Sequence, residues 1–287
     1  MPSGLTAVSG LFRDAPPRGR AKRQRGWVPW QLFRAVSLFL GFGFVLGPIV
    51  PVVYNAFNDS PVFPAPFAGL TLEWFKRVVQ SEQYMSGAVV SLLVGVGATV
   101  FALIIGISAS FAVVRGPNWI RGATITSLLM GPIVIPQIVI GLAVLEAASQ
   151  QSLHLGLLGL IVAHAVFVSP FVIRVVASAL ELQGSNLESA AMVLGSRRSA
   201  VLFRVTLPLL RPAIIASAVF AFTLSFVNVP LSLFLAPSNL RPLPIVIYQE
   251  MINTRTPALA AVSVFLAVVL LSATGLVEKL FRIRILK

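Results

Sequence analysis

Apolar residues along the chain gather in six long blocks rather than in the short periods of a soluble fold. Each block has roughly 20 residues or more, enough for a helix to cross a hydrocarbon core about 30 Å thick. Helices are expected because lipid offers no water to unpaired backbone groups, and the alternating pattern of a membrane barrel is absent. The predicted spans cover residues 30–54, 88–114, 123–148, 156–179, 213–236 and 258–280.

Two of the connections between blocks are longer than simple turns. Residues 55–87 hold a turn-rich stretch followed by a short amphipathic helix predicted over 71–79, and residues 237–257 carry four prolines. Such loops either dock a partner or serve as solvated connections, and the sequence favours neither role.

Composition supports the membrane assignment. Of the 287 residues, 57% are hydrophobic and 11% charged, whereas a soluble domain carries about 25% charged residues. The chain has no cysteine, which excludes disulfides, cysteine-based metal sites and thiol nucleophiles.

The net charge of +13 has two explanations, a nucleic-acid partner or membrane orientation. With the N-terminus in the cytosol, 18 Lys and Arg residues fall on the cytosolic side and 4 on the other. This asymmetry follows the positive-inside rule, predicts that both termini are cytosolic, and removes the reason to expect nucleic-acid binding.

Residues 1–29 form a basic arm ahead of the transmembrane remainder at 30–287. Its cations precede a long apolar span rather than a short one with a small-residue cleavage site. We therefore expect a retained cytosolic arm and not a signal peptide.

The loop at 182–212, between spans four and five, is neither apolar enough to cross nor polar enough for a linker. Ser185 and Glu188 fit a capping box, and Gly195 suits a helix stop. Ser196 is predicted to cap a second helix through about 205, ended by Leu207-Pro208. The resulting small knob either docks a protein or lies on anionic lipid. The helical period after the cap is carried by Leu187, Ala190, Ala191 and Leu194.

This loop resembles the EAA loop of binding-protein-dependent importer permeases. That signature has Glu-Ala-Ala, three residues, Gly, and a spacer to Leu-Pro, and here Ser189 takes the Glu position with Glu188 just before it. The similarity extends through 224–226 and 242–248, and the chain looks like the spermidine/putrescine-type branch. The matching residues are Ser189, Ala190, Ala191, Gly195, Leu207 and Pro208.

The resemblance implies an all-α, six-span permease of a bacterial inner-membrane importer that performs no chemistry itself. It implies a second permease subunit that is a different chain, two ATPase subunits that hold ATP and Mg, and an external binding protein. The coupling contact would involve Glu188, Ser189, Ala190, Ala191, Gly195, Arg197 and Arg198. No G-x-x-x-x-G-K-[ST] phosphate loop occurs in the chain, so ATP hydrolysis is expected in another subunit.

Polar residues inside the apolar blocks are candidates for a translocation pathway. Asn228 precedes Pro230, which frees backbone carbonyls, and Gln137 follows Pro136 in a similar setting. Each could contact solute or gate, or join two helices by a hydrogen bond. Glu146 is an intramembrane acid near the external end of its block. No metal site is expected, and His164 is more typical of a satisfied helix residue than of a ligand.

Two other functions compete with an importer permease. An ion-coupled carrier or channel would need coupling groups within the spans, and Glu146 is almost alone there. A membrane enzyme would show clustered His or carboxylates. The substrate stays open among polyamines, opine-like or other small amino compounds, and anionic phosphonates.

Overall fold

The computed structural model describes residues 27–61, 66–118, 120, 123–153, 155–254 and 256–281. The predicted basic arm lies outside this range except for residues 27–29, which begin the first helix. Contacts divide the chain into a unit ending at Val50 and a unit from Pro51 onward. Within the described residues all regular secondary structure is helical, apart from one isolated β-bridge between Asn58 and Leu70.

The first unit consists of α1 (Trp27–Leu46) and the beginning of α2 (Ile49–Phe57). Gly47 and Pro48 separate the two helices, and proline is a common helix interrupter because it lacks an N–H donor. The predicted span 30–54 is therefore present as two helices rather than one.

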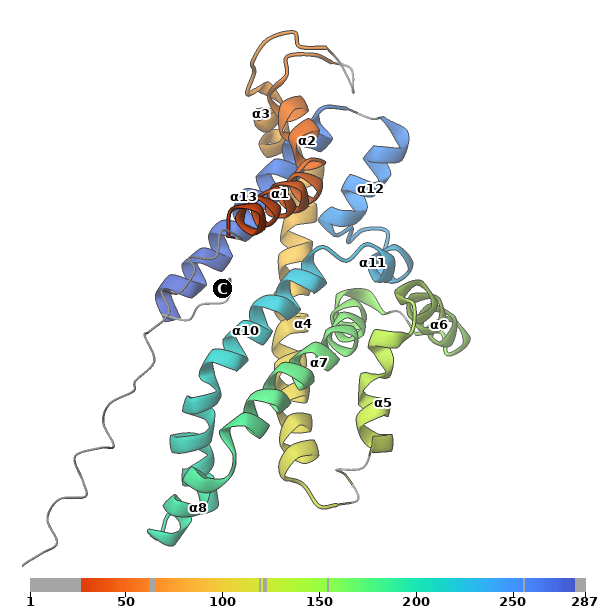
Figure 1. Cartoon of the computed structure of the whole chain (residues 1–287). Coiled ribbons are helices and arrows are strands. Elements are labelled where there is room, and N and C mark those ends of the chain that lie inside the picture. The colour runs from red at the N-terminus through yellow and green to blue at the C-terminus, as the bar shows by residue number, and fades with distance from the viewer. Residues whose placement is uncertain are drawn as a thin grey trace, which may run out of the picture. The chain divides into compact units, whose positions relative to one another are not determined.

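The second unit holds the remaining helices (Figure 1). Four long apolar segments can each cross a membrane, and the chain has up to six spans if each bent pair of helices counts as one. The helices are α3 (Glu73–Gln80), α4 (Glu82–Arg115), α5 (Ala123–Val134), α6 (Gln137–Gln150), α7 (Gly156–Gln183), α8 (Asn186–Val193), α9 (Arg198–Val201), the π-helical η1 (Leu202–Thr206), α10 (Leu207–Phe226), α11 (Pro230–Leu235), α12 (Leu243–Asn253) and α13 (Ala258–Phe281).

The all-helical, multi-span prediction is confirmed, and so is the short helix predicted at 71–79, which is α3. Besides 30–54, two further predicted spans are wrong as single helices. Residues 123–148 form α5 and α6, bent by 96° at Ile135–Pro136. Residues 213–236 contain the break at 227–229 between α10 and α11. A proline follows each break or lies in it, where its missing N–H and its ring interrupt the hydrogen-bond ladder.

The core of the second unit lies where α4, α7 and α10 pack together (Figure 1). Gly106 lets α4 approach α7 closely, because a Cβ there would lie 2.6 Å from Val172 Cγ1. One turn on, Ser110 Oγ lies 2.7 Å from the Gly106 carbonyl and 3.1 Å from the Ile173 carbonyl. The core side chains include Val94, Ala102, Leu160, Val168, Val172, Val176, Leu180, Leu210 and Ala221.

A smaller cluster at the opposite end from α8 joins α3 to the starts of α4 and α13 (Figure 1). Trp74 donates through Nε1 to the Asn58 carbonyl at 2.9 Å, and the Arg77 guanidinium lies 4.7 Å from the Trp74 ring. Glu250 on α12 accepts hydrogen bonds from Tyr84 and from Thr256, the latter at 2.8 Å. These contacts order the two longer connections, residues 55–87 and 237–257.

Substituting Gly106 with alanine should lower the thermal stability of the chain in detergent, because the added methyl group overfills the α4–α7 contact. Overpacking of this kind costs about 1–3 kcal/mol. Gly275→Ala is the matched control, since a Cβ at Gly275 in α13 meets nothing within 4 Å. Equal melting temperatures for the two variants would contradict the close approach.

Candidate functional site: an exposed loop helix and a polar helix break

The loop between α7 and α10 contains the predicted short helix. α8 runs over Asn186–Val193, and Gly195 has a φ of +85°. Glycine adopts this left-handed conformation at low cost, so the predicted helix stop at Gly195 is confirmed. Figure 1 shows α8 at one end of the bundle, beyond the end of α7.

Three details of the loop differ from the sequence-based expectation. The Ser185 side chain makes no capping hydrogen bond, and the Glu188 carboxylate, the other half of a capping box, pairs with Arg115 and Thr206 instead. Arg197, not Ser196, precedes the next helix. Leu207-Pro208 does not end that helix. The helical path that begins with α9 continues through η1 into α10. The wider π-helical turn of η1 comes directly before Leu207-Pro208 and accommodates a proline that lacks an N–H.

No residue of α8 is buried. Leu187 is 53% exposed, and Val193 and Leu194 at the helix tip are each 86% exposed. The other predicted contact residues share this exposure, except that Ala191 is half-buried: Ser189, Ala190, Gly195, Arg197 and Arg198. Apolar side chains on an isolated short helix are costly in water, so this surface is typical of a docking site.

Glu188 differs from its neighbours because its side chain faces the helix bundle and is only 14% exposed. Its Oε2 lies 3.3 Å from Arg115 Nε at the end of α4, and its Oε1 accepts a hydrogen bond from Thr206 Oγ1 at 3.1 Å. The Arg115 guanidinium also donates to the Leu180 carbonyl at 3.2 Å and to the Gly184 carbonyl. Arg115, Glu188 and Thr206 border a cavity of about 420 Å³ that is also lined by Phe111 and Met192.

A hydrogen bond between Asn228 and Gln137 joins the break between α10 and α11 to the bend between α5 and α6. Asn228, in the break between α10 and α11, is 5% exposed. It donates through Nδ2 to Gln137 Oε1 at 3.0 Å and accepts from the Leu231 backbone N–H at 2.9 Å. Gln137 is the first residue of α6, directly after the bend at Pro136. The structure therefore brings together two of the three predicted pathway residues.

A second polar cluster surrounds the same break. His164 of α7 is 1% exposed, with Nδ1 2.9 Å from Ser225 Oγ and Nε2 3.2 Å from Ser232 Oγ. The two serines lie on either side of the break, on α10 and α11. His164 is thus a satisfied helix residue, as predicted, and it joins α7 to both halves of the interrupted span.

Glu146 is not part of either cluster. It is exposed on α6 and accepts a hydrogen bond from Gln150 one turn away, at 3.0 Å. It lies nine positions after Gln137 along α6, about 13 Å of helix. No group of three His, Cys or carboxylate residues that could hold a metal occurs in the described part of the chain.

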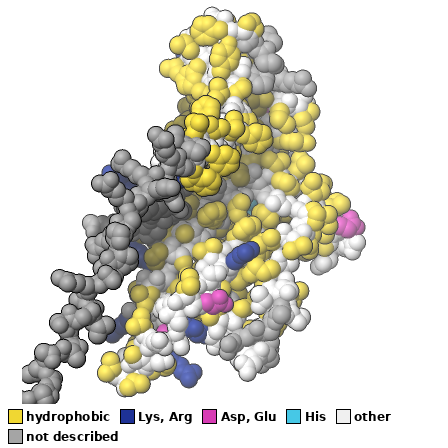
Figure 2. Space-filling model, viewed as in Figure 1, with side chains coloured by type: hydrophobic (Ala, Val, Ile, Leu, Met, Phe, Trp, Pro, Cys, Tyr) yellow, Lys and Arg dark blue, Asp and Glu magenta, His cyan; other side chains and the backbone are white. Residues whose placement is uncertain are grey.

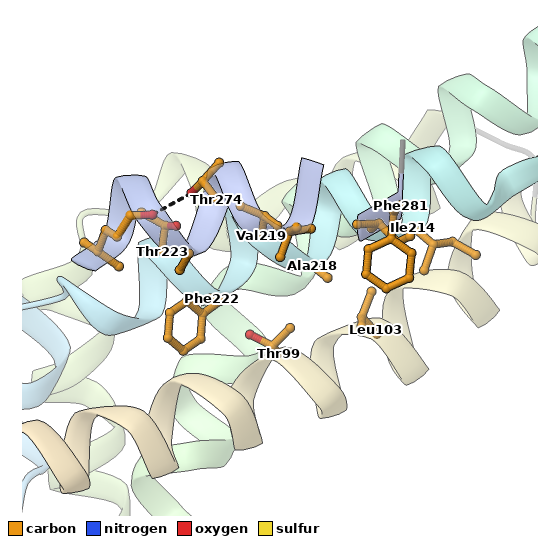
Figure 3. Close-up of a pocket in the computed structure, with 13 residues that line it drawn as sticks. Thr99, Leu103, Ile214, Ala218, Val219, Phe222, Thr223, Thr274 and Phe281 are labelled. Atoms are coloured by element: carbon orange, nitrogen blue, oxygen red, sulfur yellow. Dashed lines mark hydrogen bonds between the residues drawn. The ribbon is translucent and has the colours of Figure 1, made fainter. Parts of the chain in front are cut away.

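A large apolar cavity lies between α4, α10 and α13 (Figure 3). It has a volume of about 420 Å³ and is lined mostly by aliphatic and aromatic residues. Thr99 and Thr274 in its wall donate to carbonyls of their own helices, at 2.7 Å and 2.8 Å. A polar solute would find few partners there, so the cavity is better suited to packing than to solute recognition.

Arg115, Thr206 and Ser232 are the residues that sequence reasoning missed. Arg115 counted only as a cation for orientation, although it ends a span directly before Gly116. The pairing of Arg115 with Glu188 crosses 73 positions of sequence, and only packing of α4 against α7 brings them together.

The fold and these two regions define a helical membrane protein of the transport-permease class. A family profile described as "Binding-protein-dependent transport system inner membrane component" matches residues 98–282. The chain belongs to this family, and it is a permease subunit of a binding-protein-dependent importer of the inner membrane. The predicted family is confirmed.

Curated relatives extend the likeness over most of the chain. The putrescine transport system permease protein PotI of Escherichia coli K12 is 29% identical over 87% of this chain and 88% of its own length. The spermidine/putrescine permease PotC of the same organism is 28% identical, over 87% and 95%. The diacetylchitobiose uptake permease DasC of Streptomyces coelicolor is 28% identical, over 84% and 89%.

A solved structure supports the fold. A chain of a bacterial transporter that imports the acidic polysaccharide alginate aligns with a TM-score of 0.66 and 16% identity, covering 89% of this chain and 97% of that chain. At this identity the match shows a shared architecture and says nothing of the solute.

The Asn228–Gln137 hydrogen bond should be detectable as an energetic coupling. Asn228→Ala and Gln137→Ala are each expected to destabilise the chain toward denaturing detergent, and the double variant should lose less than the sum of the two. Hydrogen bonds between membrane helices are worth about 0.6–2 kcal/mol, which sets the expected coupling. Strict additivity in the denaturation free energies would show that the two side chains do not interact.

Proposed function

We propose that this chain converts movement of a partner ATPase into opening and closing of a membrane pathway for a small polar solute. The observation that carries the proposal is α8, a short helix with no buried residue and an apolar tip at the end of the bundle. The helix is held in a fixed position although it is exposed, as a lever contacted by another protein should be. The chain itself is not an enzyme in this scheme.

The contact with the ATPase involves the exposed side of α8 and the following bend: Ser189, Ala190, Ala191, Gly195, Arg197 and Arg198. Val193 and Leu194 supply apolar area at its centre, and the two arginines supply charge at its rim. This division matches the usual anatomy of protein interfaces, with an apolar core and a polar edge. Glu188 is excluded from the contact because its carboxylate faces Arg115 and Thr206.

The remaining partners follow from the family. Two ATPase subunits bind ATP and Mg, a second permease subunit completes the pathway, and an external binding protein delivers the solute. In Figure 2 most of the visible Lys and Arg side chains lie in the lower half of the view. Figure 1, drawn from the same side, places α8 there. The positive-inside rule then supports an orientation with α8 and both termini in the cytosol.

The pathway runs past the break between α10 and α11. Asn228 and Gln137 join that break to the bend between α5 and α6, so a small shift of either helix pair changes a hydrogen bond in the membrane interior. Discontinuous helices of this kind form solute sites and pivots in transporters, where backbone irregularity faces a cavity. Glu146, the third predicted pathway residue, is exposed on α6 and belongs to the pathway only near its mouth.

The solute is a small polar compound, such as a polyamine, an opine-like molecule or another small amino compound. The names of PotI and PotC support the polyamine choice. The groups at the break are neutral amides, hydroxyls and an imidazole, which hydrogen-bond rather than pair with charge. Selectivity for a cation would then depend on the binding protein.

Leu194→Glu should abolish copurification of the ATPase without preventing membrane insertion, because it places a charge at the centre of the apolar tip. Leu70→Glu is the matched control, since Leu70 is 80% exposed at the opposite end of the bundle. Retention of the ATPase by Leu194→Glu would contradict the proposed contact.

Gly195→Pro should reduce solute-stimulated ATP hydrolysis by the complex in nanodiscs at least about tenfold, since proline cannot adopt the φ of +85° found there. Binding of ATP by the isolated ATPase should be unaffected. If the native chain instead copurifies with no ATPase and transports with an ion gradient alone, the ion-coupled carrier replaces the importer.

A further inference from the structure

The proposed contact with the ATPase does not explain why the ion pair between Arg115 and Glu188 is largely buried. The two side chains are 26% and 14% exposed, so both charges are largely withdrawn from water. Withdrawing a charge is costly unless a partner compensates it. Here the carboxylate uses both oxygens, one toward Arg115 and one toward Thr206.

The Arg115 guanidinium joins several chain segments at one point. Arg115 is the last residue of α4; its guanidinium donates to the carbonyls of Leu180 near the end of α7 and of Gly184 directly after α7, and it pairs with Glu188 on α8. Thr206 adds η1, which continues directly into α10. One charged cluster therefore links the loop helix to the ends of all three helices of the transmembrane core.

Other attachments of α8 are weak. The helix has eight residues, none of them buried, and its N-terminus has no side-chain cap. A helix of this length is marginal in water by itself. Its orientation thus depends on the cluster at Glu188 and on the neighbouring residues of α9 and η1.

We propose that Arg115 and Glu188, with Thr206, are positioning residues that make α8 move as one body with the ends of α4, α7 and α10. The proposal rests on the proposed function, in which α8 receives the movement of the ATPase. With the cluster intact, a displacement of α8 is transmitted to the membrane helices. With it broken, α8 still contacts the ATPase but tilts independently, and ATP is hydrolysed without movement of solute.

The test compares the complete complex in nanodiscs carrying native chain, Glu188→Gln, Arg115→Gln or the double variant. Glu82→Gln is the matched control, because Glu82 is an exposed carboxylate at the opposite end of α4 from Arg115. The readout is solute moved per ATP hydrolysed. We expect Glu188→Gln to keep the ATPase bound and to lower this ratio about fivefold, the effect of a modest coupling between contacting residues. The double variant should be no worse than the poorer single variant.

Hydrogen exchange of the backbone amides supplies a second readout that general misfolding would not mimic. In Glu188→Gln the amides of α8 should exchange faster while those in the middle of α4 stay as in the native chain. A native transport ratio in Glu188→Gln, additive effects in the double variant, or loss of the ATPase from Glu188→Gln would each overturn the proposal. The last result would place Glu188 in the contact itself. Failure of the native chain to bind any ATPase would instead overturn the proposed function.

Discussion

The structure depends on one constraint, that a backbone interrupted inside a membrane must find its hydrogen-bond partners within the protein. The second unit interrupts two of its apolar spans, one at Ile135–Pro136 and one at 227–229. Asn228 satisfies part of this requirement, because its side chain accepts a hydrogen bond from the Leu231 N–H and donates one to Gln137. The two breaks therefore stabilise each other. His164 then fixes both sides of the second break through Ser225 and Ser232. The irregular region is consequently ordered, and it can change in a defined way when the helices shift.

The same logic applies outside the membrane helices, where α8 has little area of its own to bury. A charged cluster holds it instead, and its apolar tip stays available to a partner. In the proposed function, movement of the ATPase displaces this tip. The displacement is transmitted through Arg115 and Glu188 to the core of α4, α7 and α10, and along α10 to the break at Asn228. The middle of this route lies in helices that pack closely, because small residues such as Gly106 allow α4 and α7 to approach.

Much of this architecture was predictable from the sequence, and the rest was not for identifiable reasons. Apolar blocks and the charge asymmetry predict the membrane helices, and the helical period from Leu187 to Leu194, followed by Gly195, predicts the loop helix and its stop. The sequence also singled out Asn228 and Gln137, but not their contact, which depends on a bend of 96° that apolar length alone conceals. The capping box at Ser185 was wrong because Glu188 has a stronger partner in Arg115, and that partner is close only after α4 and α7 pack. Local signals cannot reveal a competition with a residue so distant along the chain.

The most direct test of the central claim, that α8 receives the movement of an ATPase, is cysteine crosslinking. The chain has no cysteine, so a single Ser189→Cys substitution introduces one thiol on the exposed face of α8. The account predicts that a short bifunctional reagent links this position to the ATPase subunit in the assembled complex, and that ATP changes the yield of the crosslink. Absence of a crosslink from position 189 and from its neighbours on α8, in a complex that still transports with ATP, would contradict the account.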